Sequence, residues 1–353
     1  MNGTRHLRQA ASWRLALALL VMTAGFGSAH IPARAQSPAE DAAFARKVFG
    51  DVNAPRPVDV GDGETRMLLP VEIAAARADA AGARMLRALA AAGADVNRKD
   101  PEGRAAVHVA AMFQAAENIR VLHELGADLD ARDADGDTPL HIAVLKGDAA
   151  LAGLLLSLGA RPEVTDRAGL TPLAALLSQA DPLLRFGGAS AGAMADLVSR
   201  LLQAGADPDR PHPTDGRTPL MFAVALPAPA ALPIVRALLA GGADPNRADH
   251  AGRTALHHAI ESGTGHGNSI AAKERASADV VRLLLAAGAD PDHRDAAGRT
   301  PLFPAAERAC SFGPDGGRHL RPSHRGRRGS RNPGRAGPHG AGAWRLLLSP
   351  AAS

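Results

Sequence analysis

Aromatic residues and cysteine are scarce in this chain. Its 353 residues include eight Phe, two Trp and no Tyr. A large core must therefore be built from Ala, Leu and Val, which suits thin helical layers better than a thick sandwich or barrel. The single cysteine, Cys310, excludes an internal disulfide framework and a zinc site made of cysteines.

Charge is spread unevenly along the chain, whose formal net charge is +4. Residues 1–35 hold four Arg and no acidic residue, and residues 311–353 hold eight Arg and one Asp. Subtracting these contributions of +4 and +7 from the total leaves −7 for residues 36–310. The body of the protein is therefore acidic, which argues against nucleic-acid binding by that part of the chain.

The first 35 residues have the pattern of a secretory signal peptide. A basic start precedes an apolar stretch from Leu15 to Gly27, and Ala33-Arg34-Ala35 forms a cleavage signal before Gln36. The stretch is shorter than the roughly 20 residues that span a bilayer, although an uncleaved anchor is the alternative. We expect a mature protein that begins near Gln36, is periplasmic or secreted, and has no membrane span after cleavage.

The last segment, residues 311–353, is rich in Gly, Pro, Arg and His and is predicted to be disordered. Its Arg-Gly character is typical of a tail that binds polyanions or nucleic acid. The alternative is that the reading frame shifts near Cys310, so that the segment is not functional.

The middle of the chain is repetitive, which must be considered before other patterns. A Gly-Ala-Asp tripeptide recurs, starting at Gly93, Gly126, Gly205, Gly242 and Gly288. The basic period is 33 residues, with insertions of 13, 4 and 13 residues in later units. A second motif, Thr-Pro-Leu-His or a variant of it, starts at Thr138, Thr171, Thr218, Thr254 and Thr300.

Two separated motifs that keep a fixed phase resemble the ankyrin repeat family across residues 65–310. The resemblance implies an all-α solenoid of stacked helix-turn-helix units, about six in number. A truncated last unit starts at Asp295, and residues 36–64 form a lead-in segment. Each unit has too little core to fold alone and is stabilised by its neighbours.

The parts of the unit have clear local roles. Thr caps the first helix, Pro occupies its first position, and Gly ends the second helix in a left-handed conformation. Small residues let the two helices approach closely, and they are Ala110, Ala143, Ala223 and Ala259. The 13-residue insertions, around 181–193 and 264–276, are predicted to lie between the two helices of their units and to be mobile.

No catalytic residue, cofactor, metal or small-molecule substrate is predicted. The resemblance implies that three histidines bridge backbone groups of neighbouring turns, and they are His108, His141 and His257. Neither the group of His257, His258 and His266 nor the aspartates 133, 135 and 137 has the full spacing of a metal site. An enzyme would need an unrecognised site in the insertions.

The predicted function is a non-catalytic, monomeric scaffold that binds another protein. Polyanion binding through the tail is the alternative, and nucleic acid is an unlikely partner for an exported acidic body. The resemblance implies contacts at the turn residues Pro101, Glu102, Arg104, Ala134, Asp135, Asp137, Arg167, Leu170, Arg217 and Arg253. It also implies contacts at the helix ends Met112, Phe113, Leu145, Lys146, Ser178 and Gln179.

Three of these helix-end residues are apolar. Met112 and Leu145 lie 33 residues apart and should stack, and Phe113 lies beside them. An exposed apolar cluster of this kind indicates a binding site. The alternative is that Met112 and Phe113 fill the joint between two helices.

Overall fold

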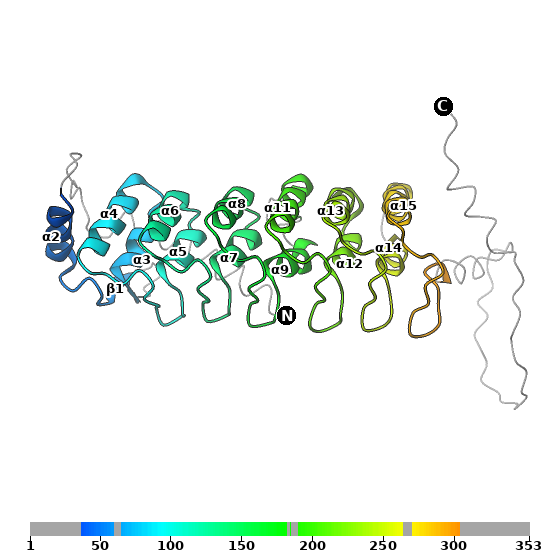
Figure 1. The fold of residues 1–353 in the computed structure, drawn as a ribbon, viewed down its shortest axis with the longest axis horizontal. Coiled ribbons are helices and arrows are strands. Elements are labelled where there is room, and N and C mark those ends of the chain that lie inside the picture. Colours follow the sequence, from blue (N-terminus) through cyan, green and yellow to red (C-terminus); the bar gives the residue numbers. More distant parts are fainter. Residues whose placement is uncertain (1–36, 60–64, 182–183, 185–189, 264–269, 304–353) are drawn as a thin grey trace, which may run out of the picture. The chain divides into compact units, whose positions relative to one another are not determined.

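The structure is a computed structural model that describes residues 37–59, 65–181, 184, 190–263 and 270–303 (Figure 1). The chain divides into two compact units, residues 1–244 and 245–353. The predicted signal peptide, the predicted tail and residues 304–310 of the truncated last repeat lie outside the described residues.

In the first compact unit, residues 1–244, short helices alternate with longer ones and lie side by side in pairs (Figure 1). The pairs are α3 (Pro70–Ala75) with α4 (Ala80–Ala91), α5 (Ala106–Met112) with α6 (Ala116–Glu124), α7 (Pro139–Leu145) with α8 (Ala149–Ser157), α9 (Pro172–Ser178) with α11 (Ala191–Gln203), and α12 (Pro219–Val224) with α13 (Ala228–Ala240). First helices pack on first helices, as α5 does on α7, and second helices pack on second helices, as α11 does on α13. The predicted helix pairs are confirmed.

The Thr-Pro motif begins the first helices, as predicted. The Thr138 hydroxyl accepts a hydrogen bond from the His141 N–H at 3.4 Å, and Pro139 takes the first helical position. Thr171 caps α9 through the Ala174 N–H at 3.3 Å. Thr218 differs, since its buried hydroxyl has no hydrogen-bond partner among the described residues.

Glycine ends the second helices because the chain must turn through a left-handed conformation there. Gly126 after α6 has φ +85°, and Gly159 after α8 has φ +98°. Residues with a Cβ are disfavoured at such φ values, so the repeated Gly is a requirement of the backbone.

Small and aliphatic side chains build the core between the two helix layers. Ala110, Ala143 and Ala223 are fully buried, together with Ile119 and Leu155 on the second helices. Alanine at the helix contact allows close approach, and the leucines supply the buried apolar area that stabilises the stack.

The predicted lead-in segment has more structure than its sequence suggested. It contains α2 (Pro38–Phe49), whose N-cap Ser37 and Glu40 exchange hydrogen bonds, and α2 packs on α4. Strand β1 (Arg56–Asp59) pairs antiparallel with β2 (Thr65–Leu68), Arg56 opposite Leu68. The described residues are mostly helical, as predicted, with this short strand pair in addition.

The insertions follow two different paths. Most of the first lies between α9 and α11, as predicted, but its residues 191–193 begin α11, and residues 182–183 and 185–189 lie outside the described residues. In the second unit, α14 (Ala255–Gly263) pairs with α15 (Ile270–Ala286), so residues 270–276 of the second insertion belong to a helix. The prediction that residues 270–276 lie between the two helices was wrong, because Ala, Lys, Glu and Arg in this stretch favour helix.

Candidate partner-binding surface

Each unit projects a tight turn between its second helix and the first helix of the next unit. We call the five-residue turns 100–104, 133–137 and 166–170 the turn tips. In each, the first residue donates its N–H to the carbonyl of the fifth, at distances of 2.8, 3.0 and 2.9 Å. The fourth residue is Gly with positive φ, for example +74° at Gly103 and +82° at Gly136.

Backbone hydrogen bonds join the turn tips to one another. The Ala134 N–H donates to the Glu102 carbonyl at 2.9 Å, and the Arg167 N–H donates to the Asp135 carbonyl at 2.9 Å. The next turn has Pro213 at the donor position, which lacks an N–H and cannot extend this row. The three turn tips therefore form one fixed row rather than three independent loops.

The predicted turn contacts differ in how far they reach solvent. Pro101, Glu102, Ala134, Asp135 and Arg167 are exposed. Four other positions are half-buried, and they are Asp137, Leu170, Arg217 and Arg253. The last position, Arg104, is buried.

Arg104 does not belong to the exposed surface. It is only 8% exposed, and its guanidinium bonds to Asp100 at 2.5 Å and to Glu102 at 3.1 Å. The Arg104 side chain closes its own turn, so its assignment as a partner contact is not supported. The same Asp-to-Arg ion pair, four residues apart, recurs as Asp249–Arg253 in the second unit.

The other two turn tips lack this arginine, because the fifth residue is Leu170 in one and Asp137 in the other. At 133–137 the place of the arginine is taken by Asp137, which is half-buried. Burial and the charges of Asp133, Asp166 and Asp135 raise the pKa of Asp137 to about 7. This tip therefore carries a concentration of carboxyl groups without an arginine to balance them.

The helix-end residues form a half-buried rather than an exposed set. Met112, Phe113, Leu145, Lys146, Ser178 and Gln179 all have this intermediate exposure. Phe113 ends α5 and is followed by Gln114 at φ +57°, a left-handed conformation that is uncommon outside glycine. The apolar patch predicted from Met112, Phe113 and Leu145 is therefore only partly open to solvent.

The repeated histidines are structural, as the resemblance implied. His108 Nδ1 accepts the Ala105 N–H at 3.1 Å, so Nε2 carries the proton and donates to the Ala131 carbonyl at 2.9 Å. His108 Nε2 also lies 3.2 Å from the Asp137 carbonyl oxygen, and His141 makes the corresponding link to the Leu170 carbonyl at 3.1 Å. Burial lowers the pKa of His108 and of His141, which keeps both rings neutral.

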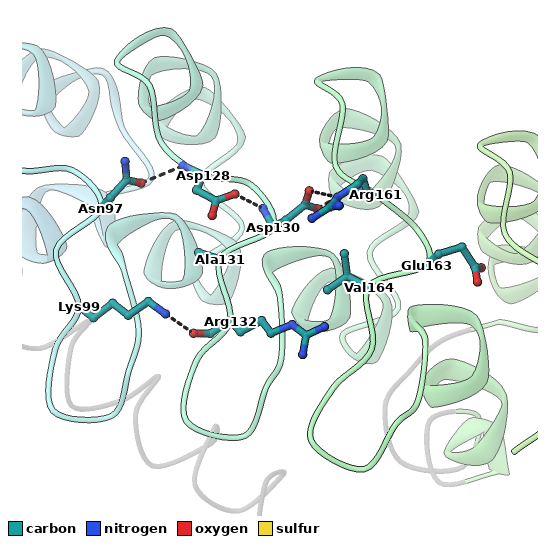
Figure 2. Close-up of a pocket in the computed structure, with 9 residues that line it drawn as sticks. All are labelled: Asn97, Lys99, Asp128, Asp130, Ala131, Arg132, Arg161, Glu163 and Val164. Carbon is teal, nitrogen blue, oxygen red and sulfur yellow. Dashed lines mark hydrogen bonds and ion pairs between the residues drawn. The ribbon is translucent and has the colours of Figure 1, made fainter. Parts of the chain in front are cut away.

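A second row of inter-unit hydrogen bonds was not predicted. It lies on the legs, by which we mean the extended stretches that lead from each second helix to the next turn tip. The Asn97 side chain accepts the Asp128 N–H at 2.8 Å, and Asp130 accepts the Arg161 N–H at 2.8 Å (Figure 2). Glu163 likewise accepts the Asp207 N–H at 2.9 Å. The sequence carries a signal for this row. Each accepting side chain stands two residues after the end of a Gly-Ala-Asp tripeptide or of its variant Gly-Ala-Arg.

Metal and membrane sites receive no support from the described part of the chain. Within it, no group of three His, Cys, Asp or Glu side chains is arranged to hold a metal ion. His266, part of one group considered above, lies outside the described residues. Among the described helices, none combines the length and apolar character that a membrane crossing requires.

Paired helices, left-handed glycine ends and projecting turns define a helical repeat protein. A family model described as ankyrin repeats (3 copies) matches residues 73–166 and 188–270, and a single ankyrin repeat matches residues 251–296. The chain belongs to the ankyrin repeat family.

Solved structures agree with this assignment. The ankyrin repeat domain of Bcl-3, a member of the IkappaB protein family, is 26% identical with a TM-score of 0.53, covering 69% of this chain and 94% of that one. An ankyrin repeat domain from Acinetobacter baumannii AYE is 27% identical with a TM-score of 0.50, covering 63% and 98%. A search of curated proteins finds no match. Ankyrin repeats generally mediate protein–protein interaction.

Proposed function

We propose that this chain is a non-catalytic scaffold of the periplasm or the secreted space, which holds a partner protein against its turn tips. The observation that supports this proposal most directly is the row of backbone bonds from Glu102 to Ala134 and from Asp135 to Arg167. A surface that is fixed before binding loses less conformational freedom when the partner arrives.

The side chains on this row face solvent and differ in chemistry. Pro101 is rigid, Glu102 and Asp135 are acidic, and Arg167 is basic, all on successive units. Such a sequence of charges selects a partner with the complementary order and suppresses others. The half-buried Phe113 and Leu145 supply apolar flanks where a partner can bury additional area.

A net-neutral charge exchange tests the surface. We expect the double substitution Asp135→Arg with Arg167→Glu to reduce capture of the specific partner at least about tenfold, because both contacts become repulsive. The matched control is Glu117→Arg with Arg120→Glu, an exchange between two exposed residues on α6. Quantitative mass spectrometry of proteins crosslinked in envelope extract gives the measurement.

The outcome is read by comparing the two exchanges. A protein that wild type and the α6 exchange retain equally, and that the turn-tip exchange loses, supports the proposal. If every captured protein is retained by the turn-tip exchange, the partner surface lies elsewhere.

The proposed setting has its own test. Export requires that the mature chain begin at or near Gln36, so N-terminal mass analysis of protein from the periplasm or medium should find that residue first. Intact Met1 on the functional protein would contradict export by cleavage.

A further inference from the structure

An open hollow of about 710 Å³ lies along the legs, outside the turn-tip surface. It spans three successive units, and its walls carry Lys99, Arg132 and Arg161 as well as acidic side chains (Figure 2). We call it the leg hollow. Its walls are held in place by the row of inter-unit bonds at Asn97 and Asp130, so its shape exists before any ligand binds.

The acidic side chains of the leg hollow are largely neutralised. Asp130 pairs with Arg161 Nε at 2.7 Å, and Glu163 pairs with Arg210 at 3.1 Å. Each of these two carboxylates therefore has a cation of its own.

Two cations in the walls of the leg hollow can still bind an anionic group, and they are Lys99 and Arg132. The Lys99 ammonium donates to the Arg132 carbonyl at 2.8 Å, which uses one of its three protons. The exposed Arg132 guanidinium has no hydrogen bond or ion pair within the described residues, and in Figure 2 it extends from its leg toward the leg that carries Val164. A guanidinium presents two parallel N–H groups that match a carboxylate.

We infer that the leg hollow binds an acidic peptide segment, with one carboxylate held by the Arg132 guanidinium and another by the Lys99 ammonium. The buried Ala131 and half-buried Val164 provide an apolar floor for the aliphatic part of a Glu or Asp side chain. The inference concerns the legs rather than the turn tips and does not depend on the proposed function of the turn tips.

The remaining charge pattern favours a peptide over a nucleic acid. Asp128 stands exposed in the wall of the leg hollow, and Asp133 follows Arg132 in the chain. The closely and evenly spaced phosphates of a nucleic acid would meet these carboxylates. A peptide can place single carboxylates at the two cations and neutral residues at the aspartates.

Direct binding tests the inference with the full-length protein. The probe is a blocked, rhodamine-labelled glycine peptide with Glu at every third position, and its reference carries Gln instead. Fluorescence anisotropy is measured at about 10 mM salt, where the Debye length is about 30 Å. We expect the Glu peptide to bind wild type more tightly than the Gln peptide.

Variants locate the binding. Arg132→Gln and Lys99→Gln should each lower the affinity for the Glu peptide about threefold, as expected for one exposed ion pair. The double variant should bind the Glu peptide no more tightly than the Gln peptide. The matched control is Arg98→Gln, which removes an equal charge from an exposed neighbour outside the leg hollow and should keep that advantage. Thermal melting of every variant confirms that the fold is retained.

Three results would overturn the inference. Equal binding of the Glu and Gln peptides means that carboxylates are not recognised. An Arg98→Gln loss as large as that of Arg132→Gln means that only net charge matters. Tighter binding of oligothymidylate than of the Glu peptide means that the surface serves nucleic acid.

Discussion

Glu72 occupies the position that His108 and His141 hold in the following units, three residues after the N-cap of the first helix. Its Oε2 accepts the Leu69 N–H at 2.7 Å, while Oε1 has no hydrogen-bond partner among the described residues. Glu72 is 1% exposed, and burial, with the nearby charge of Asp100, raises its pKa from 4.5 to about 8. At neutral pH this carboxyl group is therefore protonated.

The raised pKa of Glu72 predicts a pH dependence of stability. Between pH 4.5 and 8 the unfolded chain releases this proton while the folded chain keeps it, so the free energy of unfolding falls as pH rises. Glu72→Gln removes that contribution and should be more stable than wild type at pH 9 by on the order of 2 kcal/mol.

The measurement is the difference in unfolding free energy between variant and wild type, from urea titrations at several pH values. Glu117→Gln, at a 60% exposed carboxylate on α6, is the control and should show no such trend. A Glu72→Gln difference that does not change with pH would show that the group is ionised in the folded state.

Two repeated glycines separate backbone strain from steric fit. Gly126 and Gly136 have nearly the same φ, +85° and +82°. A Cβ on Gly126 would meet nothing within 4 Å, whereas one on Gly136 would lie 2.4 Å from the Arg167 nitrogen. Of these two glycines, Gly136 is the one at a contact between two turn tips.

We therefore expect unequal losses from the same substitution. Gly126→Ala should lower the free energy of unfolding by about 1 kcal/mol, the cost of a left-handed residue with a Cβ. Gly136→Ala should cost about 2 kcal/mol more, because the clash also separates the Asp135–Arg167 bond. Urea unfolding measures both, and equal losses would mean that the turn tips are not held together.

At the scale of the structural element, the turn is closed by an ion pair in some units and not in others. Asp100–Arg104, Asp249–Arg253 and Asp295–Arg299 pair at 2.5, 3.1 and 2.8 Å. The turn at 133–137 has Asp137 instead, among other carboxylates that raise its pKa. This turn tip lacks a contact that its counterparts use for stability.

Restoring the pair should stabilise the protein. Asp137→Arg places a guanidinium four residues after Asp133, and we expect a gain of about 1 kcal/mol at pH 8 from a charged hydrogen bond and relief of repulsion. Thermal and urea unfolding measure the gain. Glu117→Arg makes the same charge change at an exposed position on α6, and an equal gain there would mean that the effect comes from net charge alone.

At the scale of the whole first compact unit, residues 1–244, α2 covers one end of the helix stack. Phe49, 2% exposed, lies in this contact, and Arg46 donates to the Ala92 carbonyl at 3.2 Å. Asn53 accepts the Asp95 N–H at 2.9 Å and donates to the Gly93 carbonyl at 3.1 Å. These bonds repeat those of Asn97 one unit later, so α2 acts as the second helix of an additional half-unit.

Loss of this cover should loosen the adjacent helices first. Phe49→Ala should lower the free energy of unfolding by about 3 kcal/mol and speed hydrogen exchange in α3 and α4 before that in α8. Met67→Ala, at a side chain 46% exposed, is the control and should have little effect. Uniform acceleration through the first unit would indicate that α2 is not a local cap.

Local chemistry explains why much of the architecture was predictable. Thr138, Pro139 and Gly126 act on helix ends within a few residues of themselves, so a 33-residue period in these types reports helix pairs directly. The exposed turn-tip residues, such as Glu102 and Asp135, follow from the same phase. The repeat period does not predict which contacts a side chain makes once the repeats are stacked.

By itself, the sequence determined the family, the helix pairs and the positions of the turns, because capping and helical periodicity depend on near neighbours. Only the tertiary structure decided that Arg104 is buried against Asp100, that Asn97 links its leg to Asp128, and that the lead-in segment forms a cap. These features depend on burial and on contacts between separate segments, with Asn97 and Asp128 lying 31 residues apart. A stack of repeats creates such contacts at the boundaries between units, where no local pattern describes them.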